Sequence, residues 1–557
     1  MPRRRSPSDY PSSWRSALRS AAATGMPCQA ANAVAGCSVA VRGCCGVEAL
    51  LLLVTLALLP ACASLPPPPD LEPTSAFARP GETVLGALAI AAAGEHAGQS
   101  GFLVLDTGRQ AFLQRALLIE AAERGIDAQY YIWNSDQSGR YLACRLYAAA
   151  ERGVRVRLVL DDMNVTGRDA AIRVLDLHPN IEIRIFNPSP DRGGPGKWLA
   201  FASEFQRLNR RMHNKSFIAD AAFGIVGGRN IGDEYFDLHP ETNFRDRDVL
   251  AAGPIVGEIS ANFDAYWNAQ LSYPIGLLAP QSPQEPADSS VHQICPAVEA
   301  AIRLTHKPTQ DPAEANALVV QTLGGLTWAE AELVFDPPAT GREAGPDRPR
   351  QSALALRALV DRADEEILVE SAYLILGDEQ LRTLAEVKGR GVRVVALTNS
   401  LATNDLATNH SGYARRRKAM LAAGLELHEL RSDAMACAIW IEGRDDCGTA
   451  TVSLHSKSAV FDRRTVYVGS FNVNLRSIYL NSETILLIHS AQLAEQVAQA
   501  IETALAPANS WEVRMKRDGS IKWSAGAGET WSHEPATGWW TRLKSSLLRL
   551  VPMEKYL

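Results

Sequence analysis

The spacing of apolar and polar residues predicts the same order of strands and helices in two halves of the chain. In the first half the expected elements are a helix at residues 111–118, a strand at 126–133, a helix at 142–152 and a strand at 154–160. In the second half they are a strand at 367–374, a helix at 379–390 capped by Asp378, and a strand at 392–397. Such alternation is typical of an α/β fold with parallel strands joined by right-handed crossovers.

Each half also contains a segment that predicts a β-hairpin. Residues 216–219 and 223–226 are apolar runs separated by a short turn, and residues 458–461 and 466–468 repeat this pattern. The pentapeptide Arg-Gly-Val-Arg-Val occurs at 152–156 and again at 390–394, an offset of 238 residues (390 − 152). These repeats predict two duplicated lobes in the 557-residue chain.

Polar residues around the two hairpins repeat as well. His213 and Lys215 precede the first hairpin, and His455 and Lys457 precede the second at an offset of 242 residues (455 − 213). In both copies an Asp follows the Lys by five residues and an Asn follows it by fifteen, which gives Asp220, Asn230, Asp462 and Asn472. Residues i and i+2 of a strand share a face, so each His and its Lys project together. One such pair is usually an ordinary surface feature, but two matching sets predict a single pocket between facing hairpins.

Two His, two Lys and two Asn around one pocket suit phosphodiester transfer without a metal ion. A neutral imidazole attacks phosphorus and holds the phosphoryl group covalently, while a protonated imidazole gives its proton to the leaving alkoxide. Ammonium and amide groups offset the charge on the phosphoryl oxygens, which is the work of Mg²⁺ in other enzymes. No Cys-x-x-Cys pair or His cluster in the sequence suggests a metal site, and no cofactor is expected.

Each imidazole is expected to have a carboxylate partner that fixes its tautomer. Glu483 is the candidate in the second half, and Asp246 is the candidate in the first half, with Asp248 as the alternative. Asp220 and Asp462 stand at the hairpin turns, where Asp commonly caps the backbone, so a structural role is expected as readily as a catalytic one. Ser470 is a candidate supporting residue, and the glycines at 227, 228 and 469 are expected to be conformational.

Together these residues resemble a family signature. The order His-x-Lys, four residues, Asp, six residues, Gly-Gly or Gly-Ser, one residue and Asn is that of the phospholipase D superfamily, and both copies match it. Residues 207–217, 227–236, 475–477, 481–483 and 534–537 more narrowly resemble the bacterial cardiolipin synthase C branch. The likeness covers the chain from about residue 84 to its end.

The resemblance implies two phospholipase D-type α/β/α lobes that form one active site with pseudo-two-fold symmetry. It also implies a phosphohistidine intermediate and phosphatidyl transfer, with cardiolipin synthesis from two phospholipids as the expected reaction. In the family the N-terminal His is often the nucleophile, which makes His213 the nucleophile and His455 the acid. The alternatives are a phospholipase D that uses water as acceptor, a nuclease, and an inactive lipoprotein that binds phospholipid. The net charge of −6 disfavours the nuclease.

The N-terminal region has the pattern of an export signal. Residues 1–48 carry several Arg and four Cys, and we interpret them as an artefact of an upstream start codon rather than a long signal n-region. The apolar run at 49–61 is typical of a signal h-region, and the sequence from Leu59 to Cys62 resembles a bacterial lipobox. Lipidation of Cys62 would anchor the protein in the bacterial cell envelope, facing the periplasm. A plain signal peptide or a short anchor is the alternative.

The patterns described above divide the chain into six expected regions. They are a signal region at 1–61, a Pro-rich tether at 62–83, the first lobe at 84–278, a linker or insertion at 279–330, the second lobe at 331–510 and an amphipathic tail at 511–557. Trp539 and Trp540 in the tail lie among Leu, Arg and Lys residues, which is typical of a membrane interface. The alternative is a helix packed on the second lobe. The expected partners are phospholipids and a membrane surface, and nucleic acid is not expected.

Two further segments carry hypotheses of their own. Cys437 and Cys447 are ten residues apart, a spacing that suits a disulfide across a hairpin in an exported protein. Residues 413–418 form a basic cluster preceded by His410. This cluster either contacts a phosphate or lipid headgroup, or forms a solvated helix face.

Overall fold

The computed structural model describes eleven stretches of the chain, which are residues 65–67, 70–94, 96–165, 167–192, 201, 203–279, 289–338, 348–442, 450–526, 528–550 and 554–557. All of them belong to one compact unit, residues 61–557. The expected signal region and Cys62 lie outside the described residues. Within the described stretches, the structure contains no helix that is both long enough and apolar enough to span a bilayer.

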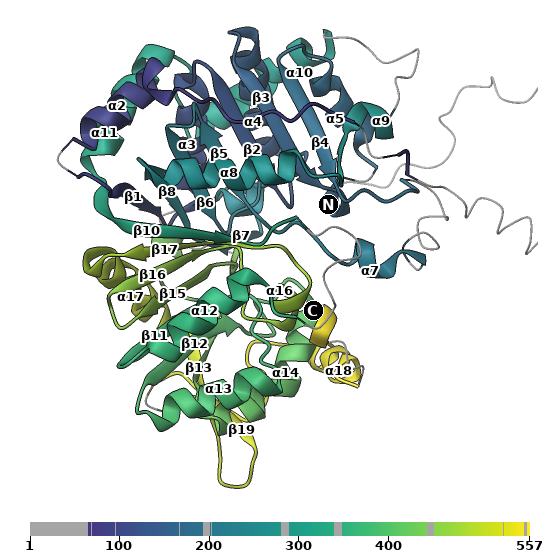
Figure 1. Ribbon diagram of the computed structural model, residues 1–557. Coiled ribbons are helices and arrows are strands. Elements are labelled where there is room, and N and C mark those ends of the chain that lie inside the picture. Colours follow the sequence, from purple (N-terminus) through teal and green to yellow (C-terminus); the bar gives the residue numbers. More distant parts are fainter. Residues whose placement is uncertain are drawn as a thin grey trace, which may run out of the picture. The chain divides into compact units, whose positions relative to one another are not determined.

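The first lobe is built on a mixed sheet with helices on both faces (Figure 1). Its strands are β1 (Ser100–Leu105), β2 (Gly125–Tyr130), β3 (Arg155–Asp161), β4 (Ile181–Phe186), β5 (Ser216–Ala219), β6 (Phe223–Gly227), β8 (Asp248–Ala252) and β9 (Ser272–Pro274). They lie in the order β1-β8-β6-β5-β2-β3-β4-β9, and only the β2–β3 and β3–β4 pairs are parallel. The helices on its faces are α3 (Gly108–Ala121), α4 (Gln137–Glu151), α5 (Asp169–Asp176) and α8 (Ile255–Trp267).

The second lobe repeats this arrangement and adds two further strands at one edge. Its strands are β10 (Thr327–Phe335), β11 (Glu366–Ser371), β12 (Arg393–Asn399), β13 (Glu426–Leu430), β15 (Lys457–Phe461), β16 (Thr465–Gly469), β17 (Thr484–His489), β18 (Ser510–Met515), β19 (Ile521–Ser524) and β20 (Thr530–Trp531). Their order is β10-β17-β16-β15-β11-β12-β13-β18-β19-β20, with β11, β12 and β13 parallel. The corresponding helices are α12 (Gln351–Arg362), α13 (Asp378–Gly389), α14 (Ala407–Ala422) and α17 (Ala491–Leu505). The predicted duplication is therefore present in the fold.

The two sheets join along one strand pair. Strand β10 pairs antiparallel with β1 of the first lobe and with β17 of its own lobe, so the sheets are continuous. A separate two-stranded parallel sheet joins β7 (Thr242–Arg245) of the first lobe to β14 (Thr451–Leu454) of the second. Buried residues of α8 and α17 belong to one apolar cluster that includes strands of both lobes. Because the junction is both hydrogen-bonded and packed, it fixes the two hairpins against each other.

The alternating pattern of the strands explains the layers. In β5, Phe217 enters the apolar cluster that also contains residues of α3 and α4, whereas Ile218 enters the cluster that contains α8. Side chains of successive strand residues point to opposite faces, and here both faces are covered, so the strand reads as a continuous apolar run.

Element boundaries differ from the sequence expectations at a few positions. Strands β2 and β11 end at Tyr130 and Ser371, several residues earlier than predicted, because the chain then turns toward the site. Helix α4 begins at Gln137, and the Asp136 side chain accepts a hydrogen bond from the Gly139 N–H. Asp378 is the first residue of α13 rather than its cap, since Gly377 occupies the cap position without a side-chain bond.

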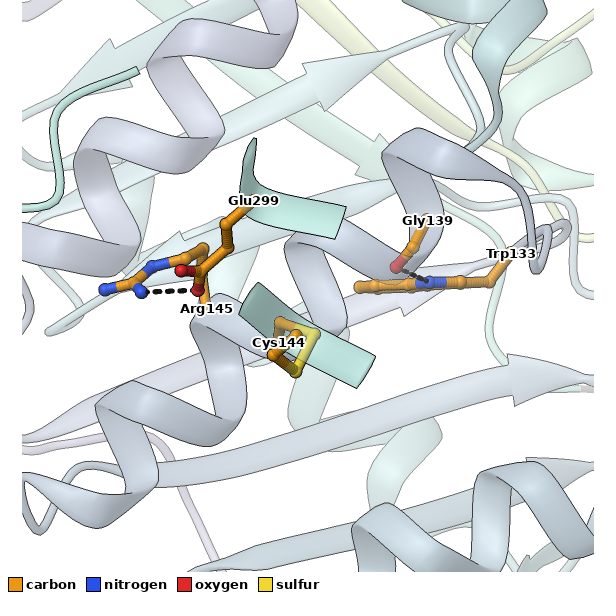
Figure 2. Close-up of a disulfide and its surroundings, with 6 residues drawn as sticks. Trp133, Gly139, Cys144, Arg145 and Glu299 are labelled. Carbon is orange, nitrogen blue, oxygen red and sulfur yellow. Dashed lines mark hydrogen bonds and ion pairs between the residues drawn. A yellow bond between two sulfur atoms is a disulfide. The ribbon is translucent and has the colours of Figure 1, made fainter. Parts of the chain in front are cut away.

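Residues 279–330, expected to be a linker or insertion, contain the helices α10 (Ser289–Thr305) and α11 (Pro312–Gly324). Both pack on the first lobe, and Val291, Ile302 and Val319 belong to its apolar core. A disulfide between Cys144 of α4 and Cys295 of α10 ties this region to the lobe (Figure 2). Cys437 is also disulfide-bonded. The expected partner, Cys447, lies outside the described residues, so that pairing stays a prediction.

The shorter elements lie between these layers and at the two ends of the described chain. They are η2 (Pro80–Glu82), α2 (Val84–Ala92), η3 (Asp162–Asn164), α7 (Phe205–Leu208), η4 (Asp233–Tyr235), α9 (Ile275–Leu278), α15 (Cys437–Trp440), α16 (Leu475–Tyr479), α18 (Trp539–Leu548) and η5 (Glu554–Tyr556). Residues 511–557 are not a single tail, because β18, β19 and β20 belong to the second sheet. Only α18 and the residues after it match the predicted amphipathic segment.

The basic cluster at residues 413–418 takes part in packing. Arg417 is buried in α14 and forms ion pairs with Glu429 and Glu534, and Arg415 and Arg416 pair with Glu554 and Asp378. Glu534 also pairs with Arg549, just after α18. Both expectations for this cluster are therefore wrong for Arg417, because its guanidinium attaches the C-terminal segment instead of contacting solvent or a ligand.

Candidate active site

The two predicted histidines lie where each lobe contacts the other. The backbone N–H of His213 donates to the carbonyl oxygen of Ser482 in the second lobe at 2.9 Å, and that of His455 donates to the carbonyl oxygen of Arg245 in the first lobe at 2.8 Å. His213 lies three residues before β5, and His455 lies two residues before β15, the first strands of the two hairpins. The expected facing arrangement of the two hairpins is therefore present, and backbone hydrogen bonds across the junction position both rings.

The carboxylates pair with the imidazoles across the lobes. Nδ1 of His213 lies 2.8 Å from Oε2 of Glu483, and Nδ1 of His455 lies 2.6 Å from Oδ2 of Asp246. The assignment of each carboxylate to the histidine of its own half is therefore wrong. The physical reason is the facing arrangement of the hairpins, which brings β17 of one lobe and the β7–β8 connection of the other against the opposite ring.

These contacts define the tautomer of each ring. An ionised carboxylate only accepts hydrogen bonds, so Nδ1 of each imidazole carries a proton and donates it. Nδ1 of His213 also lies 3.0 Å from the carbonyl oxygen of Ser470. Among the described residues, Nε2 of each ring has no hydrogen-bonding partner. Both rings therefore present a basic nitrogen to the pocket.

Burial determines the charge of these groups. It lowers the pKa of His213 to about 4, against the opposing effect of Glu483, and lowers the pKa of His455 to about 3 with help from the charge of Lys457. Burial alone would raise the pKa of Glu483 and of Asp246, but the adjacent His and Lys groups outweigh it and lower both. The resting site thus holds two neutral imidazoles and two carboxylates near neutral pH.

The two lysines supply positive charge beside the rings. Nζ of Lys215 and Nζ of Lys457 each donate to the backbone carbonyl of the histidine two residues before. Nζ of Lys457 also lies 3.0 Å from Nδ1 of His455. Burial lowers the pKa of Lys215 to about 7 and that of Lys457 to about 8, with nearby carboxylates opposing the effect. Both lysines are therefore expected to lose their protons close to neutral pH.

The two asparagines are not equivalent. Oδ1 of Asn230 accepts from the N–H of Ile132 at 3.1 Å, and its Nδ2 donates to the hydroxyl of Tyr235 at 3.0 Å. Oδ1 of Asn472 is buried and has no partner among the described residues. The amide of Asn230 is thus held by the protein, whereas that of Asn472 retains unused hydrogen-bonding capacity.

Tyr131 and Tyr235 border the rings, and both were missed by the sequence analysis, as was Tyr373. The ring of Tyr131 lies 5.1 Å from that of His213, and the ring of Tyr235 lies 5.1 Å from that of His455. The hydroxyl of Tyr373 donates to Asp405 at 2.8 Å. Tyr131 and Tyr373 are separated by 242 residues (373 − 131), the same offset as the two histidines, so the repeat contained a signal for them.

The remaining candidates have structural surroundings. Asp220 accepts hydrogen bonds from three successive N–H groups at residues 123–125, and Asp462 does the same at residues 364–366. Asp248 forms an ion pair with Arg115 at 2.9 Å rather than with an imidazole. Ser470 lies in the pocket and donates from Oγ to Oε2 of Glu483 at 2.6 Å.

Gly228 is required by the approach of a carboxylate. A Cβ at this position would stand 2.1 Å from Oδ1 of Asp246, closer than atoms of the two side chains can come. Ser470 occupies the equivalent place in the second copy, where its hydroxyl contacts Glu483 instead. The two copies therefore hold their carboxylates differently. Within the described residues, no group of three or more His, Cys, Asp and Glu side chains is placed to hold a metal ion.

Comparisons with known proteins agree with the two-lobed architecture. A protein-family model described as cardiolipin synthase, PLD-like domain, matches residues 116–267 and 356–505, one segment in each lobe. The chain is 39% identical over 468 residues to cardiolipin synthase C of Escherichia coli strain K12, which covers 83% of this chain and 97% of that protein. It is 23% identical over 424 residues to cardiolipin synthase B of the same strain, which covers 73% and 84%.

A solved structure also resembles this fold. The crystal structure of phosphatidylserine synthase from Haemophilus influenzae Rd KW20 matches with a TM-score of 0.54 and 13% sequence identity. The match covers 84% of this chain and 100% of that chain. The likeness therefore extends over both lobes and concerns the fold.

Proposed function

Because the chain belongs to the cardiolipin synthase family of PLD-like proteins, we propose that it transfers a phosphatidyl group from one phospholipid to another and so makes cardiolipin. The observation that supports this most is the pair of His–carboxylate contacts formed across the two lobes around one pocket. Two imidazoles with free Nε2 atoms, beside two lysines, are the groups that a two-step transfer through a covalent histidine intermediate requires.

In the first step, Nε2 of His213 attacks the phosphorus of the donor phospholipid. The bond between phosphorus and Nε2 forms as the bond to the headgroup alkoxide breaks, and His455 gives that alkoxide its proton. A resting His455 is neutral, so it takes up this proton when the anionic phosphodiester enters, because a nearby negative charge favours the protonated ring. The product of this step is a phosphatidyl group on His213.

In the second step, a hydroxyl of the acceptor phospholipid attacks the phosphohistidine. His455, now neutral, takes the proton of this hydroxyl, and the bond between phosphorus and Nε2 breaks. Lys215 and Lys457 offset the charge on the phosphoryl oxygens in both steps. We assign the Nδ2 group of Asn472 as a donor to one of these oxygens, because an amide N–H donates, whereas the unpaired Oδ1 of this side chain can only accept.

The proposal is tested by lipid mass spectrometry. Purified mature protein is incubated with vesicles of phosphatidylethanolamine and phosphatidylglycerol in EDTA, beside the His213→Ala variant. We expect cardiolipin with the intact enzyme and none with the variant. Phosphatidic acid without cardiolipin would instead identify a phospholipase D that uses water, and unchanged lipids would contradict both activities.

The fall of kcat/KM at high pH should reflect the pKa values of Lys215 and Lys457. A lysine is charged below its pKa and neutral above it, so the free enzyme loses positive charge as pH rises through about 7 and 8. The phosphodiester remains anionic throughout. We expect kcat/KM to fall about tenfold per pH unit between pH 7 and 8, where one required proton is lost, and about a hundredfold per unit above pH 8, where both are lost. Steady-state kinetics on short-chain phospholipid between pH 5 and 10 measure this, and a flat profile to pH 10 would contradict the assignment.

We also propose that α18 contacts a membrane surface. Its Trp539, Trp540, Leu547 and the following Leu550 are 57%, 60%, 58% and 75% exposed. The helix is nevertheless attached to the second lobe, since Ser545 is buried and Arg549 pairs with Glu534. Exposed tryptophans on a locally basic helix suit the boundary between headgroups and acyl chains. The expectations of a packed helix and of a membrane-facing helix are thus compatible.

The same proposal includes lipidation at Cys62 and a periplasm-facing position in the bacterial cell envelope. Cys62 follows the lipobox-like sequence, and the disulfide between Cys144 and Cys295 suits an oxidising compartment such as the periplasm. An anchor and an interfacial helix together would provide two attachments to the membrane.

Substitution of Trp539 and Trp540 by serine should weaken vesicle binding at least about tenfold, because interfacial burial of the two indoles is lost. Co-sedimentation with anionic vesicles measures the effect in a Cys62→Ser background, where a lipid anchor cannot mask it. The matched control replaces Ile90 and Leu304 by serine, since these are 61% and 83% exposed on other elements. Equal vesicle binding by the tryptophan variant and this control would contradict the proposal that α18 contacts a membrane surface.

A further inference from the structure

A large apolar cavity lies in the first lobe beneath helix α10. Its volume is about 360 Å³, and it is enclosed by β3, β4, α4, α5 and α10. Apolar side chains provide most of its wall, including those of Leu158, Ile172, Leu175, Ile183, Val291 and Ile294. This volume is within the range of roughly 300–1,000 Å³ that small-molecule sites occupy. An apolar cavity of this kind favours an apolar ligand over water.

The cavity adjoins the catalytic pocket through the chain segment after β2. In this segment the ring of Tyr131 contacts His213, and the N–H of Ile132 donates to Asn230. Trp133, the next residue, lines the cavity. Its indole N–H donates to the carbonyl oxygen of Gly139 at 3.1 Å, which fixes the ring at the cavity wall (Figure 2). Three consecutive residues thus connect the nucleophile to this space.

The rim of the cavity is positively charged. Arg140 and Arg168 both line it, and Arg168 donates to the carbonyl oxygen of Trp133 at 2.9 Å. Arg140 is exposed, and Ile294 is 52% exposed, so the cavity reaches the surface at these residues. An apolar interior with guanidinium groups at its opening matches a molecule that has an apolar chain and a phosphate at one end.

Helix α10 is fastened to the lobe, which keeps the cavity wall in place. The disulfide at Cys144 lies between the Trp133–Gly139 contact on one side and the ion pair of Arg145 with Glu299 on the other (Figure 2). Both cysteines of the disulfide, Cys144 and Cys295, line the cavity. A covalent bond and an ion pair thus hold α10 over a space that side chains leave unfilled.

We propose that this cavity takes an acyl chain of a phospholipid substrate while its phosphate lies toward the catalytic pocket. The inference rests on the proposed function, which supplies the acyl chain, and adds a place where that chain is bound. Trp133 lies between the acyl chain in the cavity and the phosphate at the catalytic pocket, and Arg140 and Arg168 border the acyl chain where the cavity opens to the surface. The site therefore selects long-chain over short-chain substrates.

Photo-crosslinking locates the chain directly. The probe is phosphatidylethanolamine with a diazirine at the end of one acyl chain, mixed with phosphatidylglycerol in vesicles and used with the full-length protein. We expect adducts on peptides that contain Ile172, Leu175 or Val291. The Ala143→Trp variant fills the cavity from α4 and should reduce these adducts about tenfold, the effect of losing burial of two or three methylene groups. Adducts confined to other elements, such as α18, would overturn the inference.

Matched variants separate a filled cavity from a damaged fold. Ala148→Trp makes the same change on α4 at a half-buried residue outside the cavity lining and should keep the adducts. Leu175→Trp fills the cavity from α5 and should reproduce the effect of Ala143→Trp. The two filled variants should also lose about tenfold in kcat/KM on dioleoyl substrates while keeping activity on dihexanoyl ones. Equal losses on both chain lengths would count against an acyl-chain site.

These experiments distinguish failure of the acyl-chain site from failure of the proposed phosphatidyl transfer. If the wild-type protein makes no cardiolipin but adducts still form in the cavity and disappear in both filled variants, the transfer proposal fails and the lipid site stands. If cardiolipin forms but the adducts are unchanged by both filled variants, the acyl-chain site fails alone.

Discussion

The His455→Ala variant is expected to complete the first half of the reaction on a substrate whose leaving group needs no proton, whereas His213→Ala is expected to fail on every substrate. On natural phospholipids both variants should lose activity by a factor on the order of 10⁴ or more, because nucleophile and acid act as one unit. A phosphatidyl p-nitrophenyl ester separates them, since p-nitrophenolate leaves without protonation.

The measurement is the burst of p-nitrophenol on mixing enzyme with this ester. In His455→Ala the burst should approach one equivalent of enzyme and be followed by slow turnover, with an acid-labile phosphatidyl group retained on the protein. In His213→Ala no burst should occur. A burst in His213→Ala but not in His455→Ala would exchange the two roles.

Substitution of Glu483 by glutamine should disable the histidine of the opposite lobe. The carboxylate accepts a hydrogen bond from Nδ1 of His213, which leaves the lone pair on Nε2. An amide that donates to Nδ1 would move the proton to Nε2 and remove the nucleophile, at a cost of about 10⁴ in rate for a comparable carboxylate-to-amide change. Glu483→Gln should therefore lose the nitrophenol burst as completely as His213→Ala does.

The crossed arrangement predicts the opposite result for the other carboxylate. Asp246 pairs with His455, so Asp246→Asn should lose activity on natural phospholipid but keep the nitrophenol burst. Asp248→Asn serves as the control, because this buried carboxylate is only two residues away and pairs with Arg115 instead of an imidazole. The Tm of all three variants shows whether a loss of activity comes from a changed imidazole tautomer, which leaves the Tm unaltered, or from a destabilised fold, which lowers it. A burst in Glu483→Gln that is lost in Asp246→Asn would mean that each carboxylate serves its own lobe.

Local patterns explain why the repeat and the motifs could be predicted. Strand periodicity and hairpin turns depend on neighbouring residues. The motif His213, Lys215 and Asn230 can be recognised in the sequence because all three residues flank one hairpin. The Asp220 contacts with three backbone N–H groups follow from the same local turn. Features of this kind depend little on how the lobes meet.

The crossed pairing could not be predicted in the same way. Whether Glu483 approaches His213 or His455 depends on the β1–β10 junction, which joins residues more than 200 positions apart. The inequality of Asn230 and Asn472 likewise depends on the residue five positions later, because the hydroxyl of Tyr235 accepts from the side chain of Asn230, whereas that of Ser477 accepts from the backbone N–H of Asn472. Sequence spacing alone contains no information on these choices.

Long-range bonds account for the other differences. Cys144 and Cys295 are 151 residues apart, so no local spacing marks them as a pair. Arg417 belongs to a run of basic residues, a pattern that predicts solvent exposure. In the structure it pairs instead with two carboxylates from other segments, Glu429 and Glu534. In both cases the missing information was which segment packs against the helix.

The crossed contacts also bear on how such a chain could have arisen. A solitary lobe would contain an imidazole without its carboxylate and a carboxylate without its imidazole, since Glu483 serves His213 and Asp246 serves His455. An ancestral half of this size would therefore have had a complete site only as a symmetric pair of subunits, each completing the other.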